Sequence, residues 1–170
     1  MQCFDATRNS APFDQDELRQ TFGCFATGVT VVTTLGTDGL PVGLVVNSFS
    51  SVSLDPPQIL WSIGLAAPSR PAFTSHPAFA VNIMPVEAKD ETMQFARPSD
   101  DKFSGVSWEA GFHGVPVLKS AIATLECETA RRIESGDHEI YIGDVRAISR
   151  TDGIPLIFHR GRFADLGQVI

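Results

Sequence analysis

Two strand-like runs joined by a turn constrain the fold of this chain more than any other feature. Residues 30–35, TVVTTL, are rich in β-branched side chains, which pack well on a pleated sheet. The Asp-Gly dipeptide in residues 36–41 tolerates positive φ and turns the chain back. Residues 42–54, VGLVVNSFSSVSL, are then expected to form the second arm of a hairpin. The Asp-Pro-Pro sequence at 55–57 must end that arm, because proline cannot donate to a strand ladder.

The rest of the chain alternates further strand candidates with short helices. Asp14 lies three residues before Glu17, a capping-box spacing, and Ser69 is a candidate N-cap before an early proline. Gly143 interrupts the alternation of its strand and is expected to be a bulge. Expected strands cover 58–64, 79–84, 121–134, 138–150 and a short pair within 155–166; expected helices cover 14–25, 67–76 and 87–96; residues 97–108 are expected to be a surface loop. Hairpin-linked strands with few helices predict a mainly β fold, an antiparallel barrel.

Length and composition bound the class of protein. A chain of 170 residues with 43% hydrophobic residues is expected to fold as one domain, residues 1–170. The net charge of −7 argues against nucleic acid or an acidic membrane as a partner. Cys3, Cys24 and Cys127 are odd in number and form no CxxC pair, so we expect free thiols and no metal site. No run approaches the roughly 20 apolar residues that span a bilayer, so a cytoplasmic protein is expected.

The stretch NSFSS at residues 47–51 places hydroxyls where a buried strand would carry apolar side chains. Ser48 and Ser50 share one face, and Asn47 and Ser51 share the other with Phe49. A buried hydroxyl without a partner costs about 1–3 kcal/mol, so each needs a bond to the backbone, a bulge, or a ligand that brings acceptors. The residues alone leave these alternatives open.

Several motifs in order resemble one known family. TGVTVVTT, the Asp-Gly turn, VGLVVNSFSSVSLDPP, FAVNIM, DKFSGV, GVPVL, LEC, GDHEIYIGDV and PLIFHRGRF follow the spacing of the short-chain flavin reductases, the flavin reductase-like split barrels, over about residues 18–166. The resemblance implies a homodimeric split barrel of the FMN-binding type. Members bind FMN or FAD, oxidise NADH or NADPH, and often supply reduced flavin to a separate monooxygenase component.

The same resemblance implies the site residues. The flavin ring and ribityl chain are expected along Thr27, Gly28, Val29, Thr30, Asn47, Ser48 and Phe49. The flavin phosphate is expected at Ser50 and Ser51, with Ser69, Arg70, Lys102 and Phe103 nearby. His138, in the GDH motif, is expected to be the catalytic residue, which either positions the nicotinamide or donates a hydrogen bond to the ring system. Hydroxyls and two cations can bind a phosphate through charge-assisted hydrogen bonds, which an acidic protein must concentrate locally.

The chain departs from the family pattern at three positions. Val45 stands where many members have threonine, and His159 and Phe163 stand where tyrosine is common. Phe163 could still stack against a ligand ring, with core packing as the favoured alternative. The leading function is an NAD(P)H-dependent flavin reductase. Two alternatives stay open: a flavin-bound reductase of another acceptor, such as a corrinoid cobalt centre, and a non-catalytic flavin-binding electron carrier.

Overall fold

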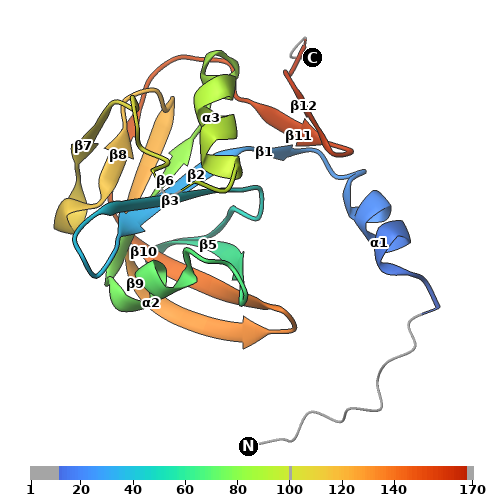
Figure 1. Ribbon diagram of the computed structural model, residues 1–170, viewed down its shortest axis with the longest axis horizontal. Coiled ribbons are helices and arrows are strands. Elements are labelled where there is room, and N and C mark those ends of the chain that lie inside the picture. Colours follow the sequence, from blue (N-terminus) through green and yellow to red (C-terminus); the bar gives the residue numbers. More distant parts are fainter. Residues whose placement is uncertain (1–11, 100, 168–170) are drawn as a thin grey trace, which may run out of the picture.

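A seven-stranded antiparallel sheet forms the body of the protein (Figure 1). The computed structural model describes residues 12–99 and 101–167. The strand order is β3-β2-β6-β9-β10-β5-β4, and every pairing in it is antiparallel. These strands are β2 (Thr30–Leu35), β3 (Pro41–Val46), β4 (Ser50–Leu54), β5 (Pro57–Gly64), β6 (Ala78–Ile83), β9 (Ala123–Ser135) and β10 (His138–Arg150). The predicted mainly β, antiparallel fold with short helices is confirmed.

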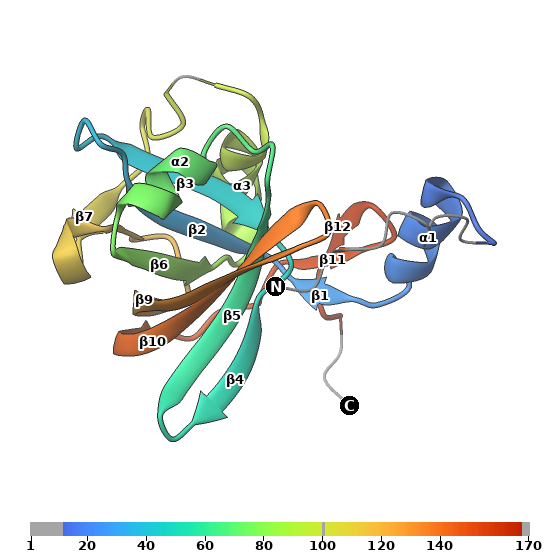
Figure 2. The same ribbon diagram turned by 90° about the horizontal axis from the view of Figure 1, so that it is seen from below.

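Two small sheets and short helices surround this body. One sheet contains β1 (Thr27–Gly28), β11 (Ile157–His159) and β12 (Arg162–Ala164), and the other contains β7 (Trp108–Ala110) and β8 (Pro116–Leu118). The helices are α1 (Gln15–Phe22), α2 (Arg70–Ser75), α3 (Lys89–Ala96) and the short 3₁₀ turns η1 (Val86–Ala88) and η2 (Phe112–Gly114). Both views show α1 standing away from the main sheet, beyond β1 and the β11–β12 hairpin (Figures 1 and 2). Within the described residues, no helix has the length and apolar character needed to cross a membrane.

The expected single arm over residues 42–54 is wrong. The chain forms two strands instead, β3 and β4, which lie at opposite edges of the seven-stranded sheet. β3 pairs with β2 as the turn predicted, whereas β4 pairs with β5 around the predicted proline stop (Figure 2). The break at residues 47–49 occurs where the Ser48 hydroxyl bonds the backbone of Ser62 in β5, so a side chain takes the place of strand pairing.

The helix signals are confirmed in part. Asp14 caps α1, since its carboxylate accepts a hydrogen bond from the Glu17 backbone N–H at 2.7 Å. Ser69 stands at the N-cap position of α2, but its hydroxyl makes no cap hydrogen bond, because Ser69 already has helical backbone angles. The expected helix over 87–96 begins with a 3₁₀ turn and becomes α-helical at Lys89.

Gly143 serves close packing and is not itself the bulged residue. The register shifts between Ile142, opposite Arg131, and Gly143, opposite Thr129, so the extra residue lies on β9. A Cβ added to Gly143 would lie 2.5 Å from Cζ of Phe79. The glycine therefore lets the Phe79 ring approach the β10 backbone.

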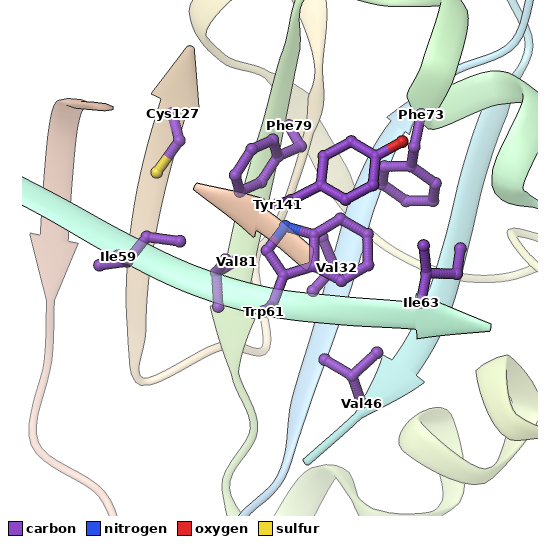
Figure 3. Packing of buried hydrophobic residues seen from close by; sticks show 10 residues of the cluster. All are labelled: Val32, Val46, Ile59, Trp61, Ile63, Phe73, Phe79, Val81, Cys127 and Tyr141. Atoms are coloured by element: carbon purple, nitrogen blue, oxygen red, sulfur yellow. The ribbon is translucent and has the colours of Figure 1, made fainter. Parts of the chain in front are cut away.

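The main core is an aromatic cluster inside the curved sheet (Figure 3). The rings of Trp61 and Tyr141 stack with centroids 4.9 Å apart, and Phe73 and Phe79 meet Trp61 edge-on at 4.9 and 5.6 Å. Such aromatic pairs stabilise a core by about 0.5–1.5 kcal/mol beyond the burial of their area. Cys127 lies buried in the same cluster as a free thiol, and Cys24 is free and exposed. Cys3 lies outside the described residues.

Candidate functional site: an apolar cavity with one cation

A cavity of about 450 Å³ lies where the end of β3, the segment before α2, the end of α3 and the β11–β12 hairpin meet. This volume falls within the range of small-molecule sites, roughly 300–1,000 Å³. Its lining residues are Val29, Leu44, Val45, Val46, Asn47, Ala67, Pro68, Ser69, Phe95, Ala96, Lys102, Phe158 and Phe163. The wall is apolar apart from an amide, a hydroxyl and an ammonium group, which is the character of a site for a flat organic ligand with a polar end.

Lys102 is the one ionisable residue among those lining residues. Its Nζ donates a hydrogen bond to the backbone carbonyl of Phe95 at 2.8 Å. Partial burial lowers the pKa of Lys102 from its ordinary value, because desolvation disfavours the charged form. An ammonium group has three donors, so two remain for an anion after the bond to Phe95. The predicted position of Lys102 at the cofactor therefore agrees with the cavity.

Aromatic side chains form the opposite wall. The rings of Phe158 and Phe163 meet edge-on with centroids 5.7 Å apart, and both line the cavity. Of the two roles left open for Phe163, the favoured one, core packing, does not describe it fully, because its half-buried side chain lines the cavity from the β11–β12 hairpin. Phe95 completes the aromatic lining and packs edge-on against Phe103 at 5.0 Å.

The four predicted flavin-site residues in and after β1 differ in their position relative to the cavity. Val29 lines the cavity. Thr27 Oγ1 is buried, and it has no hydrogen-bond partner among residues 12–99 and 101–167. A Cβ placed on Gly28 would meet no atom within 4 Å, so the backbone there borders open space. Thr30 Oγ1 instead donates to the Val46 carbonyl at 3.1 Å and holds β2 to β3.

The hydroxyl-rich stretch divides between cavity and scaffold. Asn47 lines the cavity, and Phe49 packs against the aromatic core cluster. Ser48 Oγ is engaged by the Ser62 backbone. Ser50 Oγ donates to the Ser51 carbonyl at 3.2 Å, and both serines are exposed on β4. Of the alternatives that the sequence left open, bonding to the backbone therefore explains Ser48 and Ser50.

Ser69 and Arg70 are neighbours in sequence with different surroundings. Ser69 lines the cavity. Arg70 is not among the described residues that line it: Nε donates to Glu139 at 2.8 Å and Nη2 to Glu134 at 3.0 Å. The hydrogen bond to Glu139, which is 4% exposed, raises the pKa of Arg70. Glu134 of β9 and Glu139 of β10 thus bind the guanidinium of Arg70, which the family resemblance placed near the flavin phosphate.

The connector before β7, which was expected to be a surface loop, contains a buried aromatic residue. Phe103 is only 9% exposed and packs between Phe95 and Trp108, with the latter centroid 6.1 Å away. Phe103 thereby anchors the segment that carries Lys102 to the cavity wall. A turn-rich composition did not reveal this buried ring.

His138 begins β10, opposite Gly64 at the end of β5. Its Nδ1 lies 2.7 Å from Asp137 Oδ1, and its side chain is 50% exposed. This contact with His138 lowers the pKa of Asp137. Gly64 leads into the segment that lines the cavity at Ala67, although His138 is not among the described lining residues.

Most lining residues that sequence reasoning missed are apolar, among them Leu44, Ala67, Pro68, Phe95 and Phe158. They come from segments far apart in sequence and carry no motif of their own. The sequence offered a signal only for Val45 and Phe163, at positions where the related pattern has threonine and tyrosine. Within the described residues, no group of three or more His, Cys, Asp or Glu side chains could hold a metal ion.

The fold and the cavity define a small antiparallel β protein with an apolar, phenylalanine-lined cavity and a lysine at its wall. The model of the flavin reductase like domain matches residues 22–167. The chain therefore belongs to the flavin reductase-like family, and the suspected resemblance is confirmed.

Individual relatives agree with this assignment. The chain is 40% identical to the FMN reductase (NADH) SmoA of Agrobacterium fabrum, over 85% of this chain and 82% of that protein. It is 42% identical to the reductase component of a flavin-dependent trigonelline monooxygenase of Acinetobacter baylyi, over 86% of this chain. The solved structure of the NADH:FAD oxidoreductase SgcE6 of Streptomyces globisporus superimposes with a TM-score of 0.88 at 36% identity, covering 96% of this chain and 99% of that one. The chain spans about half the length, 49% and 47%, of the first two curated relatives it matches.

Proposed function

We propose that this protein is an NAD(P)H-dependent flavin reductase that reduces FMN or FAD and supplies the reduced flavin to a separate monooxygenase. One observation carries the proposal: the cavity of about 450 Å³ combines phenylalanine rings with a single cation, Lys102, in a chain of net charge −7. Apolar walls suit an isoalloxazine ring, and the ammonium group suits its phosphate. Relatives named as FMN and FAD reductases support the same reaction.

The residues present fit a flavin. Thr27 lies two residues before Val29 of the cavity wall, and its buried Oγ1 has no hydrogen-bond partner among the described residues. The open space beside Gly28 leaves room for a ring against the backbone. Asn47 and Ser69 supply an amide and a hydroxyl at the cavity wall. Val29, Thr27, Gly28, Asn47, Ser69 and Lys102 form the proposed flavin site, with Thr30, Ser48, Phe49 and Phe103 as its support.

Hydride transfer from nicotinamide to flavin is chemistry that the two cofactors supply when bound. The protein has to orient the rings and keep water away from them. His138 is the proposed nicotinamide-positioning residue: Asp137 orients its ring from one side, and its half-exposed side chain leaves the other nitrogen available. The side chains of Arg70 and Ser50 contribute to the phosphate only if they leave their present partners, whereas Ser51 is exposed on β4.

The proposal includes the assembly. The seven-stranded sheet is a split barrel whose seam lies between β3 and β5, supported by the contact of Ser48 with Ser62. Two copies form a homodimer, supported by the exposed rings of Phe22 and Phe25, at 67% and 77%, and by Leu54 at 94%. Residues 18–166 act as one flavin-binding unit.

Steady-state oxidation of NADH and of NADPH, each with FMN and with FAD, tests the function. Rapid oxidation is expected only when a flavin is present. No oxidation with any of the four combinations would show that the protein is a flavin-binding carrier or has another activity. The absorbance spectrum of the purified protein distinguishes a tightly held flavin from one that exchanges as a substrate.

The role of His138 has its own test. His138→Ala should raise the KM for NADH about tenfold or more while the Kd for flavin changes less than about twofold. His113→Ala is the matched control, since His113 is an exposed histidine in η2, outside the site. An unchanged KM for NADH in the His138 variant would remove His138 from the mechanism.

A further inference from the structure

A second cavity, of about 490 Å³, adjoins the first. The two share Pro68, Ser69, Ala96 and Lys102, so Lys102 stands at the junction between them. The other residues lining the second cavity are Pro41, Val42, Gly43, Arg97, Pro98 and Ser99. A ligand whose anionic part lies at Lys102 can therefore extend in either direction.

The second cavity has a different character from the first. It carries Arg97 and Lys102 as cations, and no Asp or Glu is among the described residues that line either cavity. The chain has 20 acidic and 13 basic residues, so a wall with two cations and no carboxylate is unlike its average surface. Two cations spaced along one wall can each meet one phosphate group of a diphosphate, whereas a single phosphate monoester at Lys102 leaves Arg97 free.

Proline rings give this cavity its apolar faces. Pro41 at the start of β3, Pro68 before α2 and Pro98 after α3 approach it from three segments. Their rigid rings offer flat contact area at little cost in side-chain entropy. Ser69 and Ser99 add hydroxyls beside them. Such a wall suits a planar heterocycle with a sugar attached.

We propose that the second cavity binds the adenosine end of FAD, with the diphosphate at Lys102 and Arg97, so that this reductase prefers FAD to FMN. The inference rests on the proposed flavin reductase function. FMN fills only the first cavity and reaches Lys102 with its phosphate. FAD gains the contacts with Arg97, Ser99 and the proline rings in addition.

Titration of the purified protein with riboflavin, FMN and FAD, followed by flavin fluorescence, measures the preference. FAD should bind about tenfold more tightly than FMN or better. Ser99→Trp fills the second cavity, so the affinity for FAD should fall about tenfold. The affinity for FMN should change less than about twofold. Arg97→Ala should act in the same direction without adding bulk. Ser104→Trp is the matched control, because Ser104 is exposed on the same connector and lines neither cavity.

Each outcome bears on the inference. Equal affinity of the wild-type protein for FMN and FAD would overturn it. So would an equal loss of affinity for FMN and for FAD in the Ser99→Trp and Arg97→Ala variants. A raised KM for NADH with unchanged FAD affinity would assign the cavity to the nicotinamide nucleotide and also overturn it. Failure to bind any of the three flavins would instead contradict the proposed function itself.

Discussion

The hydroxyl of Ser48 takes the place of a strand partner for Ser62. Ser48 Oγ accepts a hydrogen bond from the Ser62 N–H at 3.0 Å and donates one to the Ser62 carbonyl at 3.2 Å. Both groups are partly buried, so each would otherwise need water or another strand. The chain can therefore leave β3 and enter β4 at the far edge of the sheet without leaving this part of β5 unpaired.

Ser48→Ala should lower the free energy of unfolding by about 1–3 kcal/mol, because it leaves two backbone groups of Ser62 without their partner. Urea denaturation followed by tryptophan fluorescence measures the change. Ser50→Ala is the control, since its exposed hydroxyl bonds only the neighbouring Ser51 carbonyl, and it should stay within about 0.5 kcal/mol of the wild type. Equal stability of the two variants would contradict the role given to Ser48.

Gly143→Ala should also destabilise the protein, by about 1–3 kcal/mol, because the new methyl group would overlap the Phe79 ring. The same denaturation experiment applies. Gly28→Ala adds the same methyl group at a position with no atom within 4 Å and should leave the unfolding free energy nearly unchanged. A destabilisation of similar size at both positions would contradict the cost assigned to the Phe79 contact, because the entropy effect of Gly→Ala on the unfolded chain is stabilising.

Lys102→Met should lower the affinity for FMN and for FAD about tenfold or more. The variant lacks the ammonium group, which is the charge among the residues that line the first cavity, and keeps an unbranched apolar side chain. Riboflavin, which lacks the phosphate, should bind the variant as well as it binds the wild type. Lys119→Met is the control, since this exposed lysine pairs only weakly with Glu109 at 3.8 Å. A loss of riboflavin affinity would show that Lys102 shapes the cavity and does not read the phosphate.

The buried thiol of Cys127 makes stability depend on alkaline pH. Desolvation, with smaller contributions from Asp144 and Glu126, raises its pKa from 9.0 to about 12. Above pH 9 the unfolded chain loses this proton while the folded protein keeps it, so stability falls as pH rises between the two values. The slope for one such group is about 1.4 kcal/mol per pH unit.

Denaturation at pH 8 and pH 10.5 should therefore show a smaller loss of stability in Cys127→Ala than in the wild-type protein. The Cys24→Ala variant should lose as much stability between these two pH values as the wild-type protein, since Cys24 is exposed. An identical pH dependence in both variants would contradict the raised pKa of the Cys127 thiol.

Local sequence predicted the elements of this fold well. The β-branched run at 30–35 forms β2, and the Asp-Gly dipeptide connects it to β3. The Asp-Pro-Pro sequence at 55–57 follows the end of β4. The Asp14 cap and the terminal hairpin were also predicted. These features depend on residues close together in the chain, so propensity, capping and turn chemistry suffice to identify them.

The site was predicted less completely than the elements. Val29, Asn47, Ser69 and Lys102 line the cavity as the family resemblance implied. The rings of Phe95 and Phe158 were missed, because an apolar residue looks the same in sequence whether it faces a core or a cavity.

The sequence by itself determined that this chain forms antiparallel strands of the flavin reductase-like family, since strand, turn and motif signals all lie within short segments. Only the tertiary structure decided that Arg70 pairs with Glu139, 69 positions away, and that the Ser48 hydroxyl bonds Ser62. The first contact joins helix α2 to β10, and the second joins the break between β3 and β4 to β5. Their partners follow from how the sheet curves in space, which no local pattern encodes.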